Sequence, residues 1–221
     1  MNSSPDKNEK ALLKLEAERS RLEDMKAYEK KHSTFALICG IDEAGRGPFA
    51  GPVAAGAVIL DLTDPDKEIL YLNDSKKLSE KKREQLYKEI KEKAVAIGVG
   101  LVDNHEIDEI NILQATYKAM RLAILSLPVR PDFILADAVH IPDIDIPQEG
   151  IIKGDAKSVS IAAASIVAKV TRDHIMLEYD KLYPEYGFAS HKGYGTKAHI
   201  EALKKYGPLD IHRKTFIKKY I

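Results

Sequence analysis

The sequence predicts an α/β protein with a mixed five-stranded sheet flanked by helices. Three apolar runs in the first half of the chain have the character of strands, at 35–42, 52–60 and 94–103. Two shorter runs, at 132–137 and 150–155, then alternate with helical patterns. Early strands followed by strand–helix alternation are typical of sheets that combine antiparallel and parallel pairing.

Helical patterns fill most of the intervals between these runs. Within 73–93, a loop leads to Ser79, which suits the N-cap of a helix. Residues 104–127 form an amphipathic pattern that Pro128 ends, and 158–183 form a long helical pattern. Four small residues of that last segment, Ala162 to Ser165, permit close packing. A loop, a helix and a basic tail follow.

An N-terminal extension, residues 1–34, precedes the catalytic domain that we predict for 35–221. Residues 8–31 contain strong helix formers and no glycine or proline. A narrow apolar stripe, interrupted by Glu18, consists of Ala11, Leu15, Leu22 and Met25. We expect a solvated helical appendage. The alternatives are a helix docked on the domain and an arm that contacts another protein.

Composition excludes several classes of protein. The 221 residues are 44% hydrophobic and 31% charged, which is typical of globular rather than disordered chains. The N-terminus is charged from Asp6 onward, and no apolar stretch approaches the ~18 residues of a membrane span. The single cysteine, Cys39, lies in an apolar run, so we expect a buried thiol and a cytoplasmic protein.

Charge is unevenly distributed along the chain, although the net charge is zero. Residues 31–150 contain 14 Lys and Arg against 20 Asp and Glu, whereas residues 151–221 contain 13 against 7. A basic region beside an acidic one suits a polyanion held near a metal site. Ordinary scatter of surface charge is the alternative.

Four carboxylates occupy positions where apolar runs end: Asp42, Glu43, Asp137 and Asp155. Strand ends of open α/β sheets are common ligand sites. Asp42 and Glu43 are consecutive and would point to opposite faces of a regular strand, but the bend at 45–47 could bring both to one site. For any single acid, a turn or capping role is the simpler interpretation, whereas the four acids together favour a metal site.

Hard divalent cations, Mg²⁺ or Mn²⁺, match this oxygen-rich set, because the sequence offers no thiol or histidine cluster beside it. Two such ions about 4 Å apart can promote an in-line phosphodiester displacement. A nucleotide-binding phosphate loop is the rival interpretation of residues 40–47. It fits poorly, because Arg46 and Gly47 replace the lysine and the hydroxyl residue of that motif, and two acids inside the loop would repel phosphate.

The segment DEAGRGP, residues 42–48, resembles the bacterial type 2 ribonucleases H. Further segments resemble the family in the same order: NDSKKLSEKKR (73–83), HEIDEINIL (105–113), KGD (153–155), IAAASIVAKVTRD (161–173), YGFASHKGYGT (186–196) and HRKTF (212–216). The resemblance extends from about residue 35 to 218. It implies a ribonuclease H-like fold and hydrolysis of the RNA strand of RNA–DNA hybrids. It also implies incision 5′ of single ribonucleotides embedded in duplex DNA, leaving 3′-hydroxyl and 5′-phosphate ends.

The resemblance also assigns roles to residues of this chain. The metal-binding catalytic acids are expected to be Asp42, Glu43, Asp137 and Asp155. Gly45, Arg46 and Gly47 are expected to contact the ribose 2′-hydroxyl and the adjoining phosphates. Tyr194 is expected to sense the junction, with its ring packed on the neighbouring deoxyribose. Within a basic run, Ser75 and Lys76 are expected phosphate contacts.

Some residues depart from the pattern or remain open. Many relatives have glycine after the third acid, where this chain has Ala138, which could alter the local turn. Asp173 competes as a fourth ligand, but a helix-surface pair with Lys169 is the simpler reading. His191 and His212 could be core or hydrogen-bonding residues as readily as ligands, so we leave them out of the metal site.

Two other functions remain as alternatives. A type 3 ribonuclease H would cut only longer hybrids, but the segment of about 34 residues before the first strand is short for its extra N-terminal domain, and GRGP with Tyr194 differs from that type. A non-catalytic hybrid-binding protein would be expected to lack one of the four acids. The tail KTFIKKYI loosely resembles a sliding-clamp peptide, yet Phe216 and Tyr220 are four apart, so we expect it to pack on the domain. We expect a monomer.

Overall fold

A five-stranded mixed sheet forms the centre of the computed structural model, which describes residues 7–221. The strands are β1 (Ile38–Ala44), β2 (Val53–Ile59), β3 (Ala96–Val102), β4 (Phe133–Asp137) and β5 (Gln148–Ile151). Their order across the sheet is β3-β2-β1-β4-β5. The first three pair antiparallel, and β1–β4 and β4–β5 pair parallel, so the predicted mixed sheet is confirmed.

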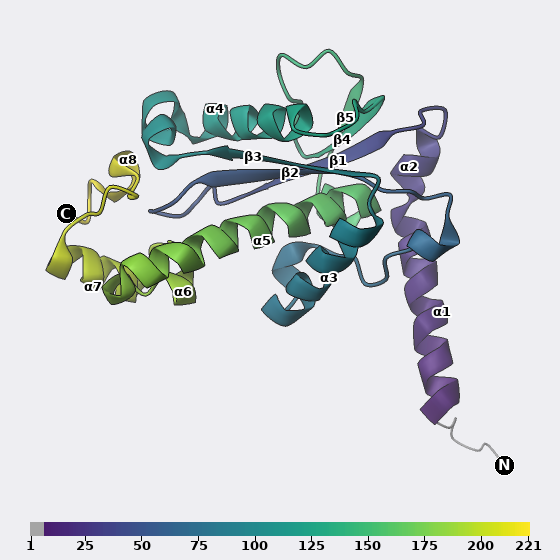
Figure 1. The fold of residues 1–221 in the computed structure, drawn as a ribbon, viewed down its shortest axis with the longest axis horizontal. Helices are drawn as coiled ribbons and strands as arrows, with labels where there is room; N and C mark the ends of the chain where they lie inside the picture. The colour runs from purple at the N-terminus through teal and green to yellow at the C-terminus, as the bar shows by residue number, and fades with distance from the viewer. Residues whose placement is uncertain (1–6) are drawn as a thin grey trace.

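Helices cover both faces of the sheet (Figure 1). The face above the sheet in that view carries α4 (Asn104–Leu125), and the opposite face carries α5 (Val159–Leu182) with α3 (Glu80–Lys93) beside it. The predicted close packing of α5 is confirmed, because a Cβ added at Gly56 of β2 would lie 2.6 Å from the carbonyl oxygen of Ala164. Ser79 caps α3 by accepting a hydrogen bond from the amide of Lys82, as predicted.

Several elements differ from the prediction, among them β1, which begins at Ile38 and not at residue 35. Strand β5 ends at Ile151, so the predicted strand over 150–155 is wrong in its second half, which is a 3₁₀ turn (Gly154–Ala156). Helix α4 contains a kink at Asn111, whose φ of 68° and ψ of 163° are not helical. The N-terminal pattern forms two helices, α1 (Lys7–Met25) and α2 (Ala27–Lys31), instead of one.

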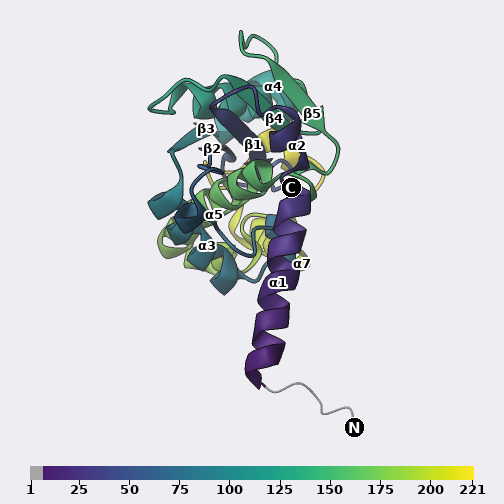
Figure 2. The ribbon, with the colours of Figure 1, turned by 90° about the vertical axis from the view of Figure 1, so that its right-hand side faces the viewer.

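The N-terminal helices are only partly a solvated appendage. Ala11 is exposed and the first turns of α1 project away from the body (Figure 2), whereas Leu22 and Met25 are buried in the core beneath the sheet. Glu29 of α2 is also buried, and its carboxylate accepts hydrogen bonds from the hydroxyl of Ser158 and the amide of Ser160 at the start of α5. The docked alternative is therefore correct for the second half of the extension. Residues 1–6, including Asp6, lie outside the described residues.

The C-terminal part of the chain packs beside the far end of α5 as three short helices. These are α6 (Phe188–His191), α7 (Lys197–Tyr206) and α8 (Lys214–Ile217). They share a small core that is centred on Phe188 and Ile217, both fully buried. The predicted packing of the tail on the domain is confirmed, because Phe216 packs against the main core and the ring of Tyr220 lies 4.9 Å from that of Phe49. None of the helices between residues 7 and 221 has the length and apolar composition of a membrane span.

Candidate metal centre and substrate pocket

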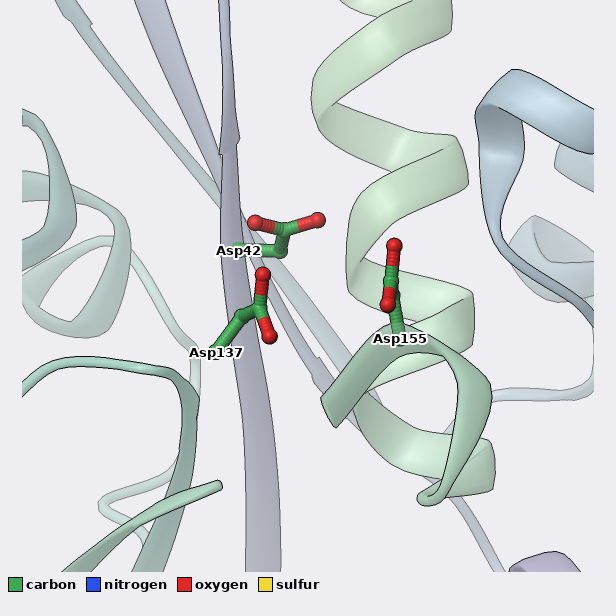
Figure 3. A group of neighbouring side chains, drawn as sticks. All are labelled: Asp42, Asp137 and Asp155. Atoms are coloured by element: carbon green, nitrogen blue, oxygen red, sulfur yellow. The ribbon is translucent and has the colours of Figure 1, made fainter. Parts of the chain in front are cut away.

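Two of the predicted acids lie on neighbouring parallel strands. Ile41 of β1 pairs with Ala136 of β4, so Asp42 and Asp137, the next residue of each strand, emerge side by side. Asp155 approaches them from the turn before α5 (Figure 3). Each of the three side chains offers a carboxylate oxygen within 4.8 Å of the others. The structure therefore brings three of the four predicted acids into one group.

The turn that carries Asp155 is fixed by its neighbours. Lys153 adopts a left-handed conformation with φ of 59°, which reverses the chain after β5. The amide of Gly154 then donates a hydrogen bond of 2.6 Å to Oδ1 of Asp137. A Cβ at Gly154 would lie 2.6 Å from Cδ1 of Ile161, so a larger residue here would require the Ile161 side chain to shift. Asp155 thus reaches the group from a turn and not from a strand end, which corrects the prediction.

The acids of this group repel one another when charged. Asp42 is 7% exposed, and its burial, together with Glu43 and Asp137, raises its pKa well above the usual value. Burial and the nearby Asp74 and Asp137 raise the pKa of Asp155 to about 6. Lys76 lies near these carboxylates and is positively charged. Burial opposes its charge, but the carboxylates outweigh burial and raise its pKa. Oxygen donors with excess negative charge fit a hard divalent cation.

Glu43 lies beside this group without joining it. It is the residue after Asp42 on β1, and its carboxylate lies 3.4 Å from a guanidinium nitrogen of Arg46. Burial raises the pKa of Glu43, Arg46 opposes the shift, and Asp137 reinforces it. The bend at 45–47 therefore does not draw Glu43 into the three-acid group, but Glu43 does line the same pocket as Asp42.

A pocket of about 370 Å³ opens over Asp42. Every substrate-binding residue predicted from the sequence lines it: Gly45, Arg46, Gly47, Ser75, Lys76 and Tyr194. The side chain of Tyr194 is 44% exposed. A Cβ added at Gly47 would meet one atom within 4 Å among the described residues, Cε1 of Tyr194 at 3.7 Å. The backbone at Gly47 and the tyrosine ring therefore face each other across a gap that a methyl group would fill without a clash.

Gly45 has a different reason to be glycine. Its φ of 95° is unfavourable for other residues, and a Cβ there would lie 2.1 Å from Nε of Arg172. The protein itself therefore requires glycine at position 45. At Gly47 the protein leaves room for a methyl group, so the bare backbone leaves that space open to a ligand.

Sequence reasoning missed Asp74 and Lys169 near the site. Asp74 is close enough to Asp155 to raise its pKa, and its carboxylate accepts a hydrogen bond from the amide of Lys76 at 2.9 Å. A carboxylate directly before Ser75 and Lys76 was an available signal. Lys169 lines the pocket from α5. Because it lies one helical turn before Asp173, the sequence pattern predicts it only as the ion-pair partner of that residue.

The residues left open by the sequence have definite partners. Asp173 pairs with Lys169 at 2.6 Å as predicted, but its side chain is buried instead of lying on the helix surface. His191 accepts a hydrogen bond from the amide of Gly193, and His212 is fully buried against His199. These two histidines lie outside the acidic group. Ala138 has φ of 54°, a conformation that favours glycine, so the turn persists without one.

Comparisons with known proteins agree with this arrangement. The sequence model of the family described as ribonuclease HII matches residues 39–219. The chain is 61% identical over 212 residues to the ribonuclease HII of Lachnoclostridium phytofermentans, covering 96% of this chain and 82% of that protein. Among solved structures, the ribonuclease H2 from Pyrococcus horikoshii has a TM-score of 0.67 and 30% identity, covering 83% of this chain and 96% of that one.

A second solved structure is a complex of PCNA with the RNase HII of Archaeoglobus fulgidus. Its similarity to this chain has a TM-score of 0.63 at 26% identity, covering 80% of this chain and 93% of that one.

Proposed function

We propose that this chain, which belongs to the ribonuclease HII family, incises 5′ of single ribonucleotides embedded in duplex DNA. This activity would be in addition to that of a metal-dependent ribonuclease H acting on RNA–DNA hybrids, which the family membership supports. The proposed reaction is a two-metal hydrolysis that leaves 3′-hydroxyl and 5′-phosphate ends. The observation that carries the proposal is the pocket in which Gly47 and the ring of Tyr194 face each other next to Asp42.

The metal ligands in this proposal are Asp42, Asp137 and Asp155, with Glu43 at the edge of the group. Divalent cations bound there would supply the positive charge that stabilises the attacking and leaving oxygens of a phosphodiester displacement. The two ions would be Mg²⁺ or Mn²⁺, since all the available donors are carboxylate oxygens. The hydrogen bond from Gly154 fixes one oxygen of Asp137 and so orients the carboxylate.

The ribonucleotide would be recognised between the two glycines and the tyrosine. We propose that the backbone of Gly45, Arg46 and Gly47 contacts the ribose 2′-hydroxyl and its phosphates, because the space at Gly47 permits a close approach. Tyr194 would pack on the deoxyribose of the next nucleotide, where a second 2′-hydroxyl would clash with the ring. Ser75 and Lys76, which also line the pocket, would hold a phosphate.

The alternatives differ in what they require of the same residues. A type 3 specificity, limited to longer hybrids, would leave the exposed ring of Tyr194 without a role in recognition. A non-catalytic binder would not need three carboxylates with oxygens within 4.8 Å of one another. The acidic group and the exposed tyrosine together favour a junction-cutting enzyme.

The test uses a DNA duplex that contains one ribonucleotide, incubated with the protein and Mg²⁺ or Mn²⁺, followed by mapping of the product ends. One cut on the 5′ side of the ribonucleotide, absent with Asp42→Asn, is the expected result. Cleavage of a continuous hybrid without any cut at the single ribonucleotide would replace the proposal by type 3 specificity. Uncut substrate in both cases, with or without EDTA, would support the binder.

The remaining proposals concern context. We propose that residues 35–221 hold the activity and that the extension, residues 1–34, supports them through the contact of Glu29 with the start of α5. The enzyme would be a cytoplasmic monomer. Contact of the tail with a sliding clamp, by analogy with the Archaeoglobus complex, would require release of Phe216 and Tyr220 from their packing, so we expect it to be weak.

A further inference from the structure

Two loops that lie far apart in the sequence meet at the pocket. The first reading loop is residues 45–52, and the second reading loop is residues 191–195. The amide of Phe49 donates a hydrogen bond of 2.8 Å to the carbonyl of Gly193, and a Cβ at Gly195 would lie 2.1 Å from the Phe49 ring. The loops therefore pack in direct contact, so movement of one changes the distance between Gly47 and Tyr194.

Arg213 anchors the first reading loop through hydrogen bonds to its backbone. Its side chain is fully buried, and its guanidinium donates to the carbonyls of Gly45 at 2.6 Å, Arg46 at 2.9 Å and Gly51 at 2.9 and 3.1 Å. A planar guanidinium can direct several donors at fixed angles, which a lysine cannot do. The three carbonyls are thereby fixed relative to one another by a side chain that is not part of the pocket lining.

His212, the preceding residue, holds the second reading loop through His199. The carbonyl of Tyr194 can only accept, so Nδ1 of His199 must donate to it across 2.9 Å. A neutral His199 therefore accepts at Nε2, and Nε2 of His212 donates to it at 3.0 Å. Nδ1 of His212 then accepts from the amide of Leu209 at 2.9 Å, so each ring has one defined tautomer.

A third buried side chain joins the two loops directly. Arg172 of α5 donates to the carbonyls of Ala50 and Pro52 in the first reading loop and to that of Lys192 in the second. The strand-like bridge between Ala50 and His212 adds a backbone connection. The loops are thus anchored from two sides, by α5 and by the C-terminal segment.

We propose that the pair His212–Arg213 is a positioning bracket that sets the spacing between Gly47 and Tyr194 and thereby determines selectivity for the ribonucleotide junction. This inference rests on the proposed function. A continuous hybrid presents a 2′-hydroxyl at every step, so a displaced loop still finds one. A single ribonucleotide presents one hydroxyl and one neighbouring deoxyribose, so loss of the spacing weakens junction cleavage more than hybrid cleavage.

The experiment compares kcat/KM on the single-ribonucleotide duplex with kcat/KM on a continuous hybrid, using full-length variants. In His212→Asn, the amide oxygen can replace Nδ1 as acceptor, but the donor toward His199 is lost. In His212→Gln, the longer side chain can place a donor near the position of Nε2. Arg213→Lys keeps the charge but loses the fork of donors. Ile90→Val, buried on α3 away from both loops, controls for a loss of stability of about 1 kcal/mol.

The ratio of junction to hybrid cleavage is expected to fall about tenfold in His212→Asn and Arg213→Lys. It should return to within about threefold of the wild-type ratio in His212→Gln and stay at the wild-type value in Ile90→Val. Nitrogen-15 spectra of the imidazoles should show His199 protonated at Nδ1 in both proteins, and the shift that marks a hydrogen bond accepted at Nε2 of His199 should be present in the wild-type protein and lost in His212→Asn.

Equal losses on both substrates in His212→Asn, matching those of Ile90→Val, would overturn the bracket and leave a structural role only. The same conclusion would follow if His212→Gln were no better than His212→Asn. Because Arg213→Lys could fail to fold, the comparison of His212→Asn with His212→Gln decides the question by itself. A wild-type protein that cuts hybrids but not junctions would instead refute the proposed function, and the bracket with it.

Discussion

The carboxylate of Asp137 accepts a hydrogen bond of 2.6 Å from the amide of Gly154, the residue next to Asp155. One acid of the metal group therefore holds the turn that presents another. A change at Asp137 would remove a ligand and also release the turn. For this reason Asp42, whose carboxylate accepts a hydrogen bond from the adjacent amide of Glu43, is the better position for separating metal binding from folding.

Asp42→Asn is expected to stabilise the protein in the absence of metal. Asp42 is buried among Asp137 and Asp155, whose carboxylate oxygens lie within 4.8 Å of its own, and the mutation removes one of these mutually repelling charges. We expect the free energy of unfolding in EDTA to rise by about 1 to 3 kcal/mol at pH 7.5. Urea unfolding of both proteins measures it.

Addition of Mn²⁺ should reverse this order. The wild-type protein should gain stability as the ion neutralises the acids, and Asp42→Asn should gain much less. Cleavage should require metal in the wild-type protein and be absent in the variant. If Mn²⁺ raised the melting temperature of both proteins equally, Asp42 would be excluded from the metal site.

Gly47→Ala is expected to lower cleavage without affecting folding. The added methyl would meet only the Tyr194 ring, at 3.7 Å, so the free energy of unfolding should change by less than about 0.5 kcal/mol. The same methyl would occupy the space proposed for the sugar, so kcat/KM should fall about tenfold or more. Gly45→Ala is the matched comparison, because its positive φ and the contact with Arg172 predict a loss of about 2 kcal/mol. Full activity of Gly47→Ala would show that the substrate does not approach this backbone.

Tyr194→Ala should reduce junction cleavage more than hybrid cleavage. The ring is 44% exposed and borders the pocket, so its removal should leave the fold intact. The loss of its packing on the deoxyribose should affect only substrates that have a deoxyribose at that position. Steady-state kinetics on both substrates measures the difference. Equal losses on the two substrates would assign the ring a structural role.

Stability should decrease as the pH falls from about 6.5 to about 4. Burial lowers the pKa of His199 and of His212 to about 4, and the neighbouring rings of His191 for His199, and of His199 for His212, lower it further. In this pH range the unfolded chain binds protons that the folded protein does not, so the free energy of unfolding rises with pH. The contribution of the two neutral histidines is fully present above about pH 6.5. One pKa unit corresponds to about 1.4 kcal/mol, so the pair contributes on the order of several kcal/mol.

Urea unfolding at pH 7, 6 and 5 measures this dependence. His212→Asn lacks one of the two rings and should lose less stability over the same interval, and the comparison removes the contribution of the other titrating groups. A pH dependence identical in both proteins would mean that the buried pair is not responsible for it.

Local pattern was sufficient to predict the sheet and part of the site. Apolar runs located all five strands, and strand pairing then brought Asp42 beside Asp137, as expected for carboxylates that end parallel strands. Asp155 was assigned to the correct group for the wrong reason. Its position depends on the left-handed backbone of Lys153 and on the amide of Gly154, and periodicity does not encode either feature.

The supports behind the pocket could not be predicted from local pattern. Arg213 and Gly45 are 168 positions apart, and no spacing rule connects a basic residue in a tail to carbonyls in a turn. The basic C-terminal third was interpreted as a surface for a polyanion. Part of that charge, on Arg172 and Arg213, is instead buried and used on the backbone of the protein itself.

The distance between Gly45 and Arg213 along the chain also has a consequence for biosynthesis. At about 5 to 20 residues per second, a ribosome needs roughly ten to thirty seconds to progress from one to the other. During that interval the strands and all the acids of the metal group can already have emerged, while the carbonyls of the first reading loop still lack their donor. On the role proposed for Arg213, the nascent protein would assemble its acidic group before the support of the first reading loop, and selectivity for the junction would be acquired late in synthesis.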